Sequence, residues 1–382
     1  MEIIKSDKTK KVISNSTNKI NTVNKINKIE TKKEETKNEE INIKIKEPIT
    51  TTKVSSTKKV YDVNANKVKS YGPNGFIVPS KEKIKDAMGI TSAVPDKVRD
   101  YMTKNYNEDY DPIPIPRPGD WLWENKESYQ TFKLFDSGIK NVPNKFKSVI
   151  YLKNMDVGLE GTLITDEVMD KFVQVMQLYY PTGVKVQVLK NKNNFENLKI
   201  KSRKNPWTDL LQYSGSDALT ILLDIIPKDG FMILGITSFD IYNKEEQNFV
   251  FGLARSMSST GLFSIQRYYE DLKYSIKDKD DLLLNAVKGA AGTMVHEVGH
   301  LFGIKHCVYF NCKMNGGSMF TETPSAPAYD FCPVCIRKLR SSLKFDIKDR
   351  LSNLAKGLSE IFGKSVGLSN EIAFFENRYN SI

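Results

Sequence analysis

The chain has 382 residues, of which 40% are hydrophobic and 27% are charged, and its formal net charge is +11 at pH 7. A chain of this length can bury a sizeable core, so it needs neither disulfides nor metals to reach a stable fold. The charge is uneven: residues 1–70 hold 17 lysines and nine acidic residues, whereas the remaining 312 residues hold 40 basic and 37 acidic groups. Because that second part is nearly balanced, we do not expect nucleic acid to be its partner.

The beginning of the chain, MEIIKSDKTKKV, lacks the apolar run of a secretory signal. No later window approaches the roughly 18 consecutive apolar residues of a membrane span. We therefore expect no membrane association and an intracellular location, in the cytoplasm, the nucleus or both. In such a reducing compartment, the four cysteines are expected to be metal-binding thiolates more often than disulfides.

Three regions are expected along the chain. Residues 1–70 are rich in Lys and Asn and contain a single aromatic residue, so they are predicted to be a disordered tail. A localisation or nucleic-acid role for its lysines is a second interpretation of this tail. Residues 71–145 are predicted to be a lead-in packed on the domain, extended where prolines cluster at residues 111–126. Residues 146–382 are predicted to form the main folded domain.

Runs of strand length follow in that domain, with one amphipathic helix between the first two. The helix is expected at residues 164–180, with Thr165 as its cap and apolar residues at helical spacing. Strand, helix and then several strands predict an α+β fold with a twisted mixed sheet. The runs predicted as strands are 148–152, 184–189, 218–226, 231–237, 248–254 and 262–266.

Two further helices are expected toward the end of the chain. Residues 278–302 have acidic residues at their start and apolar residues near a common stripe, which predicts one long helix. Near the carboxyl end, apolar residues from Ile347 to Phe362 recur every three or four positions, which predicts a C-terminal helix that closes the core.

All three histidines of the chain lie in the segment HEVGHLFGIKH. His296 and His300 are four residues apart on the predicted long helix, so both rings project from one face and can reach one zinc ion. Glu297 is offset between them and can act as the general base for a zinc-bound water. The alternative interpretation is that these are ordinary core histidines.

Gly303 can adopt a positive φ, stop the helix and turn the chain, so that His306 returns to the same ion as a third ligand. Three protein ligands leave the fourth position of a tetrahedral zinc open, as in catalytic sites. The metal would then lower the pKa of the bound water and polarise a carbonyl.

The four cysteines form two pairs, Cys307 with Cys312 and Cys332 with Cys335, with 19 residues between the pairs. This spacing is typical of a closed four-thiolate zinc site at residues 307–335. Two disulfides or four buried thiols are the alternatives. Because Cys307 follows His306 directly, a structural zinc here would also position the third histidine.

The pattern H-E-x-x-H-x-x-G-x-x-H is the metzincin signature. Together with Cys307, Cys312, Met314, Cys332 and Cys335 at these spacings, it resembles the archaemetzincin (archaelysin) family. Weaker similarity extends through residues 119–132, 249–256 and 332–339. The resemblance implies two zinc ions per chain: one catalytic ion bound by the three histidines with Glu297 as base, and one structural ion bound by the four cysteines.

The same resemblance implies Met314 as the methionine of a turn beneath the metal. It also implies a zincin-like fold, in which an antiparallel edge strand lies above the cleft; residues 248–254 or 262–266 are the candidates for this strand.

We therefore expect a monomeric zinc metallopeptidase that acts on a peptide or protein substrate. The alternative is a catalytically weak or inactive binding protein on a zincin scaffold.

Overall fold

The computed structural model describes residues 70–255, 258–317 and 328–382. Apart from Ser70, the predicted tail lies outside the described residues. No helix in the described ranges is long and apolar enough to cross a membrane.

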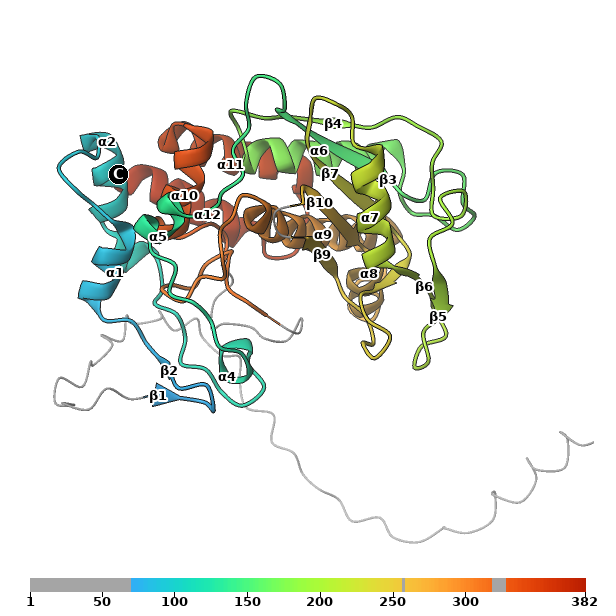
Figure 1. Cartoon of the computed structure of the whole chain (residues 1–382), viewed down its shortest axis with the longest axis horizontal. Helices are drawn as coiled ribbons and strands as arrows, with labels where there is room; N and C mark the ends of the chain where they lie inside the picture. Colours follow the sequence, from blue (N-terminus) through green and yellow to red (C-terminus); the bar gives the residue numbers. More distant parts are fainter. Residues whose placement is uncertain (1–69, 256–257, 318–327) are drawn as a thin grey trace, which may run out of the picture. The chain divides into compact units, whose positions relative to one another are not determined.

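The centre of the fold is a five-stranded sheet with the order β4-β3-β7-β10-β9 (Figure 1). Its first four strands are parallel, and β9 alone runs antiparallel, paired with β10 at the edge. The strands are β3 (Val149–Asn154), β4 (Lys185–Val188), β7 (Gly230–Thr237), β9 (Gly252–Arg255) and β10 (Thr260–Ser264). The predicted mixed sheet is confirmed. Of the two candidates for the edge strand, the first, residues 248–254, overlaps β9, although only residues 252–254 of it are strand.

Two smaller sheets accompany it. The strands β5 (Ser202–Lys204), β6 (Leu211–Ser214) and β8 (Asp240–Tyr242) form a three-stranded sheet, and β1 (Ser70–Tyr71) pairs with β2 (Phe76–Ile77).

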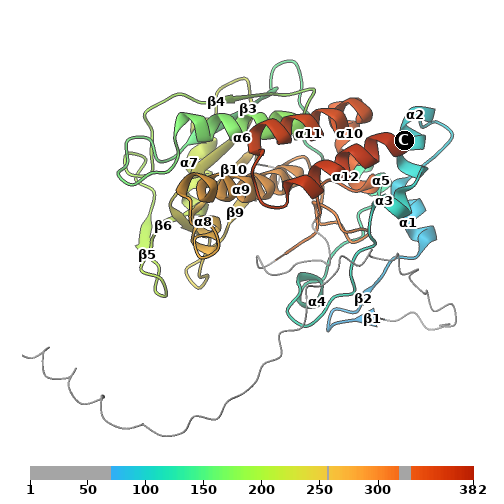
Figure 2. The same cartoon turned by 180° about the vertical axis from the view of Figure 1, so that it is seen from behind.

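Helices cover both faces of the central sheet. On one face lie α6 (Asp166–Tyr179) and α9 (Lys279–Leu301), which bury one set of alternating strand residues, among them Ile150 and Leu234. On the other face lies α7 (Gly215–Ile225), which buries the opposite set, among them Tyr151 and Ile233. Seen from behind, α11 (Ile347–Phe362) and α12 (Leu368–Ser381) lie near α6 (Figure 2).

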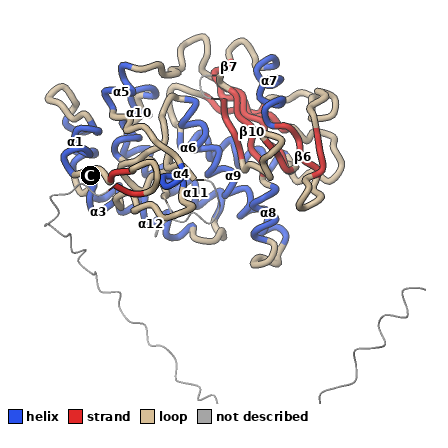
Figure 3. Tube along the Cα trace, turned by 60° about the horizontal axis from the view of Figure 1, so that its bottom comes forward, coloured by secondary structure: helices blue, strands red, loops and turns tan. Residues whose placement is uncertain are grey.

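Most of the remaining helices gather away from the central sheet (Figure 3). The remaining helices are α1 (Lys81–Met88), α2 (Asp96–Thr103), α3 (Tyr106–Asp109), α4 (Trp121–Glu124), α5 (Phe132–Ser137), α8 (Gln266–Leu272) and α10 (Pro333–Leu343).

The three helices predicted from periodicity are confirmed. The Thr165 side chain accepts a hydrogen bond from the backbone N–H of Val168 at the start of α6, and Asp278 caps α9 in the same way. The expected C-terminal helix is α11, but α12 follows it and was not expected.

The strand predicted at residues 218–226 is wrong, because this run belongs to α7. Its buried residues Ala218, Leu219 and Leu222 share one helical face, while Leu223 is exposed. The Ser214 side chain accepts a hydrogen bond from the Asp217 N–H and starts the helix.

The extended conformation predicted for residues 111–126 is interrupted at its end by a short helix, α4. The lead-in at residues 71–145 as a whole contains α1 to α5.

Candidate metal centre

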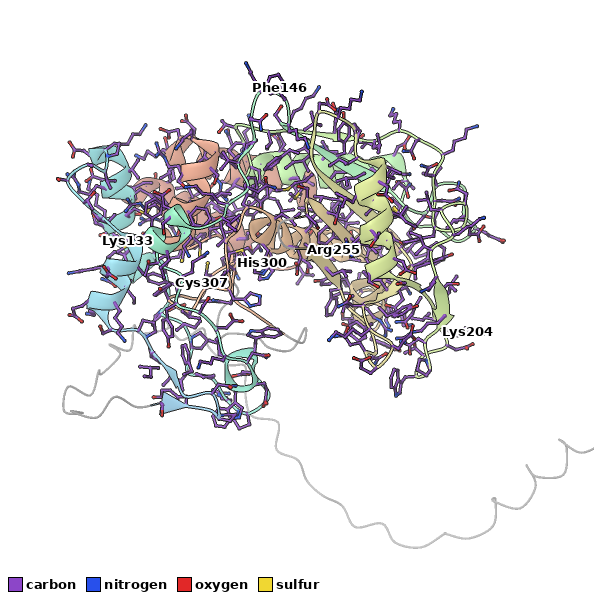
Figure 4. The ribbon with its side chains drawn as sticks, viewed as in Figure 1. Lys133, Phe146, Lys204, Arg255, His300 and Cys307 are labelled. Atoms are coloured by element: carbon purple, nitrogen blue, oxygen red, sulfur yellow. The ribbon has the colours of Figure 1, made fainter. Side chains whose placement is uncertain are left out.

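Helix α9 carries two of the three histidines near its carboxyl end. His296 and His300 are one turn apart, and their Nε2 atoms lie 3.1 Å from each other. The His300 side chain projects downward from α9, with Cys307 near it (Figure 4). The helix therefore brings the Nε2 atoms of His296 and His300 close enough to bind the same metal ion.

The turn after α9 returns the third histidine to that point. Gly303 has φ +93°, and its N–H donates to the carbonyl of His300 at 2.9 Å. A side chain at this position would be strained by the positive φ, and its Cβ would lie 3.1 Å from the carbonyl oxygen of Ile139. Glycine thus allows the sharp turn that brings His306 to the other two histidines.

The Nδ1 atoms of the first two histidines are both occupied. His296 Nδ1 lies 2.7 Å from the Lys313 carbonyl oxygen, and His300 Nδ1 lies 2.6 Å from the Ile304 carbonyl oxygen. A carbonyl oxygen only accepts, so each Nδ1 carries the hydrogen and each Nε2 keeps a free lone pair. Burial lowers the pKa of His296 well below its usual value and that of His300 to about 4, which favours the neutral, metal-binding form.

His306 has a carboxylate partner instead. Its Nδ1 donates to Glu127 Oε1 at 2.6 Å, and Trp121 Nε1 donates to the same oxygen at 2.6 Å. Burial raises the pKa of Glu127, but the hydrogen bonds from His306 and Trp121 outweigh it, and the pKa lies below its ordinary value. Glu127 therefore accepts as an ionised carboxylate.

The three histidines form a donor set that fits zinc. One ligand nitrogen from each lies within 4.8 Å of the other two. Three imidazoles are a common ligand set of catalytic zinc sites.

Glu297 lies beside this cluster, and with His296 it lines a cleft of about 1180 Å³. Burial raises its pKa to about 7, although the charge of His306 and a hydrogen bond from the backbone N–H of Ala254 both act to lower it. Because Ala254 belongs to β9, the edge strand and the helix meet at this carboxylate. The cleft is bordered by residues 247–252, by α9, and by the start of α12.

The four cysteines also come together. Cys307, Cys312, Cys332 and Cys335 are buried, and their sulfur atoms lie within 4.8 Å of one another. All four are free thiols, so the arrangement does not favour the disulfide alternative. The backbone N–H of Cys332 donates to Cys312 Sγ at 3.2 Å, which suits an anionic sulfur. A tetrahedral four-thiolate zinc fits this donor set.

Met314 connects the two clusters. Its carbonyl oxygen accepts a hydrogen bond from the Cys307 N–H at 2.7 Å. Its side chain is fully buried against Gly299, where an added Cβ would lie only 2.4 Å from Met314 Sδ. The methionine thus packs directly beneath the turn of α9 that ends in His300.

All ten residues that the sequence analysis selected therefore lie in or next to these two clusters. Sequence reasoning missed Trp121, Glu127 and Gln130, which contact the histidine loop from a distant part of the chain. They lie within residues 119–132, but nothing in their spacing links them to the histidines.

Comparison with known proteins gives consistent results. The chain matches the model described as Peptidase family M54 over residues 155–341. It is 31% identical to Archaemetzincin-2 of Mus musculus, with 66% of this chain and 75% of the relative covered. It is 29% identical to Archaemetzincin-2 of Homo sapiens, with 70% and 80% covered, and 24% identical to Archaemetzincin-1 of Homo sapiens, with 64% and 53% covered.

Among solved structures, the chain is similar to archaemetzincin from Methanopyrus kandleri. The identity is 25% and the TM-score is 0.38, with 53% of this chain and 99% of that chain covered.

Proposed function

The chain belongs to peptidase family M54, the family of the archaemetzincins, and from this premise we propose that it hydrolyses peptide bonds at a zinc ion held by His296, His300 and His306. It is a zinc metallopeptidase, and its substrates are peptides or proteins. The observation that carries the histidine assignment is the convergence of three imidazoles within 4.8 Å, two of them with Nδ1 tied to a backbone carbonyl oxygen.

Zinc bound by three imidazoles supplies a Lewis acid that polarises the scissile carbonyl and lowers the pKa of a water molecule in the open position. Glu297 takes the proton of the attacking water on its carboxylate and then passes it to the nitrogen of the leaving amine. Burial supports this role, because a desolvated carboxylate has a higher proton affinity than an exposed one.

The four cysteines are proposed to hold a second, structural zinc. A closed four-thiolate site leaves no position for water or substrate, so its contribution is to folding. Because Cys307 is bonded to His306 in sequence, the second ion fixes the loop that carries the third histidine.

The proposal is tested by the zinc content per chain of the wild type, Glu297→Ala and Cys332→Ser, with hydrolysis of a peptide library measured on the same samples. We expect two zinc ions in the wild type, one fewer in Cys332→Ser, and no hydrolysis by Glu297→Ala at unchanged zinc content. Hydrolysis by Glu297→Ala at the wild-type rate would contradict the assignment of the base. Two zinc ions without hydrolysis in any sample would favour the binding-scaffold alternative.

A further inference from the structure

The stretch from Trp121 to Gln130 contacts the histidine loop although it lies outside residues 155–341, which the family model matches. It begins with α4, leads to α5, and is separated from His306 by more than 170 positions in sequence. These contacts therefore come from a segment that is far in sequence from the metal-binding motifs.

Glu127 makes the most direct of them. One oxygen, Oε1, accepts from both His306 Nδ1 and Trp121 Nε1, each at 2.6 Å. The Glu127 side chain is 15% exposed and that of His306 is 20% exposed, so water competes little for this hydrogen bond. The Trp121 ring meets the imidazole of His306 edge-on, with 5.2 Å between the ring centroids. The carboxylate and the indole thus restrict both the tautomer and the rotation of the ring.

Gln130 holds the backbone of the same loop. Its Nε2 donates to the Gly303 carbonyl oxygen at 3.0 Å, and its Oε1 accepts from the Lys305 N–H at 3.0 Å. The buried ammonium of Lys338 donates to the backbone and side-chain oxygens of Gln130, at 2.6 and 3.1 Å. The Gln130 side-chain amide therefore holds the backbone of the turn before His306 at Gly303 and at Lys305, and Gln130 is itself bound by the ammonium group of Lys338.

We propose that Glu127 is a positioning residue for the third zinc ligand: it holds His306 with the hydrogen on Nδ1 and, through its negative charge, increases the zinc affinity of Nε2. A carboxylate that accepts from a metal-binding imidazole raises the basicity of the other nitrogen and fixes the ring. This inference rests on the proposed function, because it assumes zinc at the histidine cluster.

The test uses the full chain and measures the zinc dissociation constant of the weaker class of site by competition with a chromogenic chelator. Glu127→Ala removes both the acceptor and the charge, and we expect about 10- to 100-fold weaker zinc binding. Glu127→Gln keeps an oxygen that can accept both hydrogen bonds but carries no charge, so a smaller, several-fold loss is expected. Glu124→Gln is the matched control, since this side chain of α4 is exposed and accepts a hydrogen bond from the Gly119 N–H. This variant should bind zinc as the wild type does.

Steady-state kinetics on the same samples separates positioning from substrate binding. Because Glu127 acts through His306, its variants should lose kcat at zinc concentrations below saturation while KM for the peptide stays near the wild-type value. Wild-type zinc affinity in Glu127→Gln would overturn the inference, and this variant remains decisive if Glu127→Ala does not fold.

The two proposals fail in different ways. Weakened zinc binding by the Glu127 variants, in a protein whose wild type hydrolyses no peptide, would leave the inference standing and contradict the proposed function. Hydrolysis by the wild type, together with unchanged zinc affinity in both Glu127 variants, would support the proposed function and contradict the inference about Glu127.

Discussion

The contact between Gly299 and Met314 allows a sharp test of how tightly the region beneath the histidines is packed. Gly299 lies in α9 next to His300. A Cβ added there would lie 2.4 Å from Met314 Sδ and 3.0 Å from its Cε. Gly292 is a matched control two turns earlier on the same helix, where the nearest atom to an added Cβ is Lys313 Nζ at 3.7 Å, an ordinary contact. Glycine to alanine therefore causes no steric clash at position 292 but a clash with Met314 at position 299.

The expected free energies follow from two terms. Alanine in a helix interior is favoured over glycine by about 1 kcal/mol, so Gly292→Ala should stabilise the protein by about 0.5–1 kcal/mol. Gly299→Ala gains the same propensity but forces the buried thioether aside, and such overpacking costs about 1–3 kcal/mol. The net result should lie between neutral and about 2 kcal/mol destabilising.

Met314→Ala provides the second half of a double-mutant cycle. Alone it opens a cavity and should destabilise the protein by about 2–5 kcal/mol. In that background the clash is gone, so Gly299→Ala should become stabilising by about 1 kcal/mol. The sign of its effect should therefore reverse.

The assay is urea unfolding at a fixed excess of zinc, because bound metal shifts apparent stability. A Gly299→Ala variant that is as stabilised as Gly292→Ala in the wild-type background would refute the packing argument. An unchanged effect of Gly299→Ala in the Met314→Ala background would refute it as well, since the cost would then have no connection with the thioether.

Three further predictions concern buried charges and metal removal. Asp330 and Arg350 form a fully buried pair with two hydrogen bonds of 2.8 Å, so Asp330→Asn should lower the free energy of unfolding by about 3–5 kcal/mol. Asp209→Asn, in an exposed ion pair, should lower it by less than about 1 kcal/mol. Equal effects of the two substitutions in urea unfolding would contradict this prediction. Burial lowers the pKa of Lys153 from 10.5 to about 8, so between these pH values the unfolded state holds the extra proton. The stability of the wild type relative to Lys153→Met should therefore rise with pH across that window, by up to about 3 kcal/mol, and a flat or falling difference between pH 7 and pH 10.5 would exclude this origin. Increasing chelator should abolish hydrolysis before it lowers the thermal midpoint, because four thiolates release zinc last; simultaneous loss would argue against two distinct sites.

The histidine and cysteine clusters could be found from the sequence because local geometry determines them. His296 and His300 share a helix face, and a four-residue separation places their rings together in any regular helix. Gly303 marks the end of that helix because its φ of +93° is strained for other residues. Each cysteine pair is likewise local, and only the meeting of the two pairs required the fold.

The error at residues 218–226 shows where such patterns fail. An apolar run of this length is compatible with a buried strand or with a helix that is covered on one face. The cap formed by Ser214 and Asp217, three residues apart, was the available local signal for a helix. Tertiary packing decides the rest: Leu223 is 42% exposed on α7, which a central strand of this sheet would not allow.

The outer contacts of the histidine cluster could not be predicted in this way, for a physical reason. Periodicity constrains residues a few positions apart, whereas Glu127 and His306 are separated by 179 positions and Gln130 and Lys338 by 208. Glu127 is one of 46 acidic residues. Residues 119–132 resemble the family, but no spacing rule connects Glu127 to the histidines until the fold places it at His306 Nδ1. The ligands of this site thus follow from spacing within one helix and one turn. The orientation of the third ligand depends instead on a segment far away in sequence, which makes Glu127 the residue to test once the ligands are known.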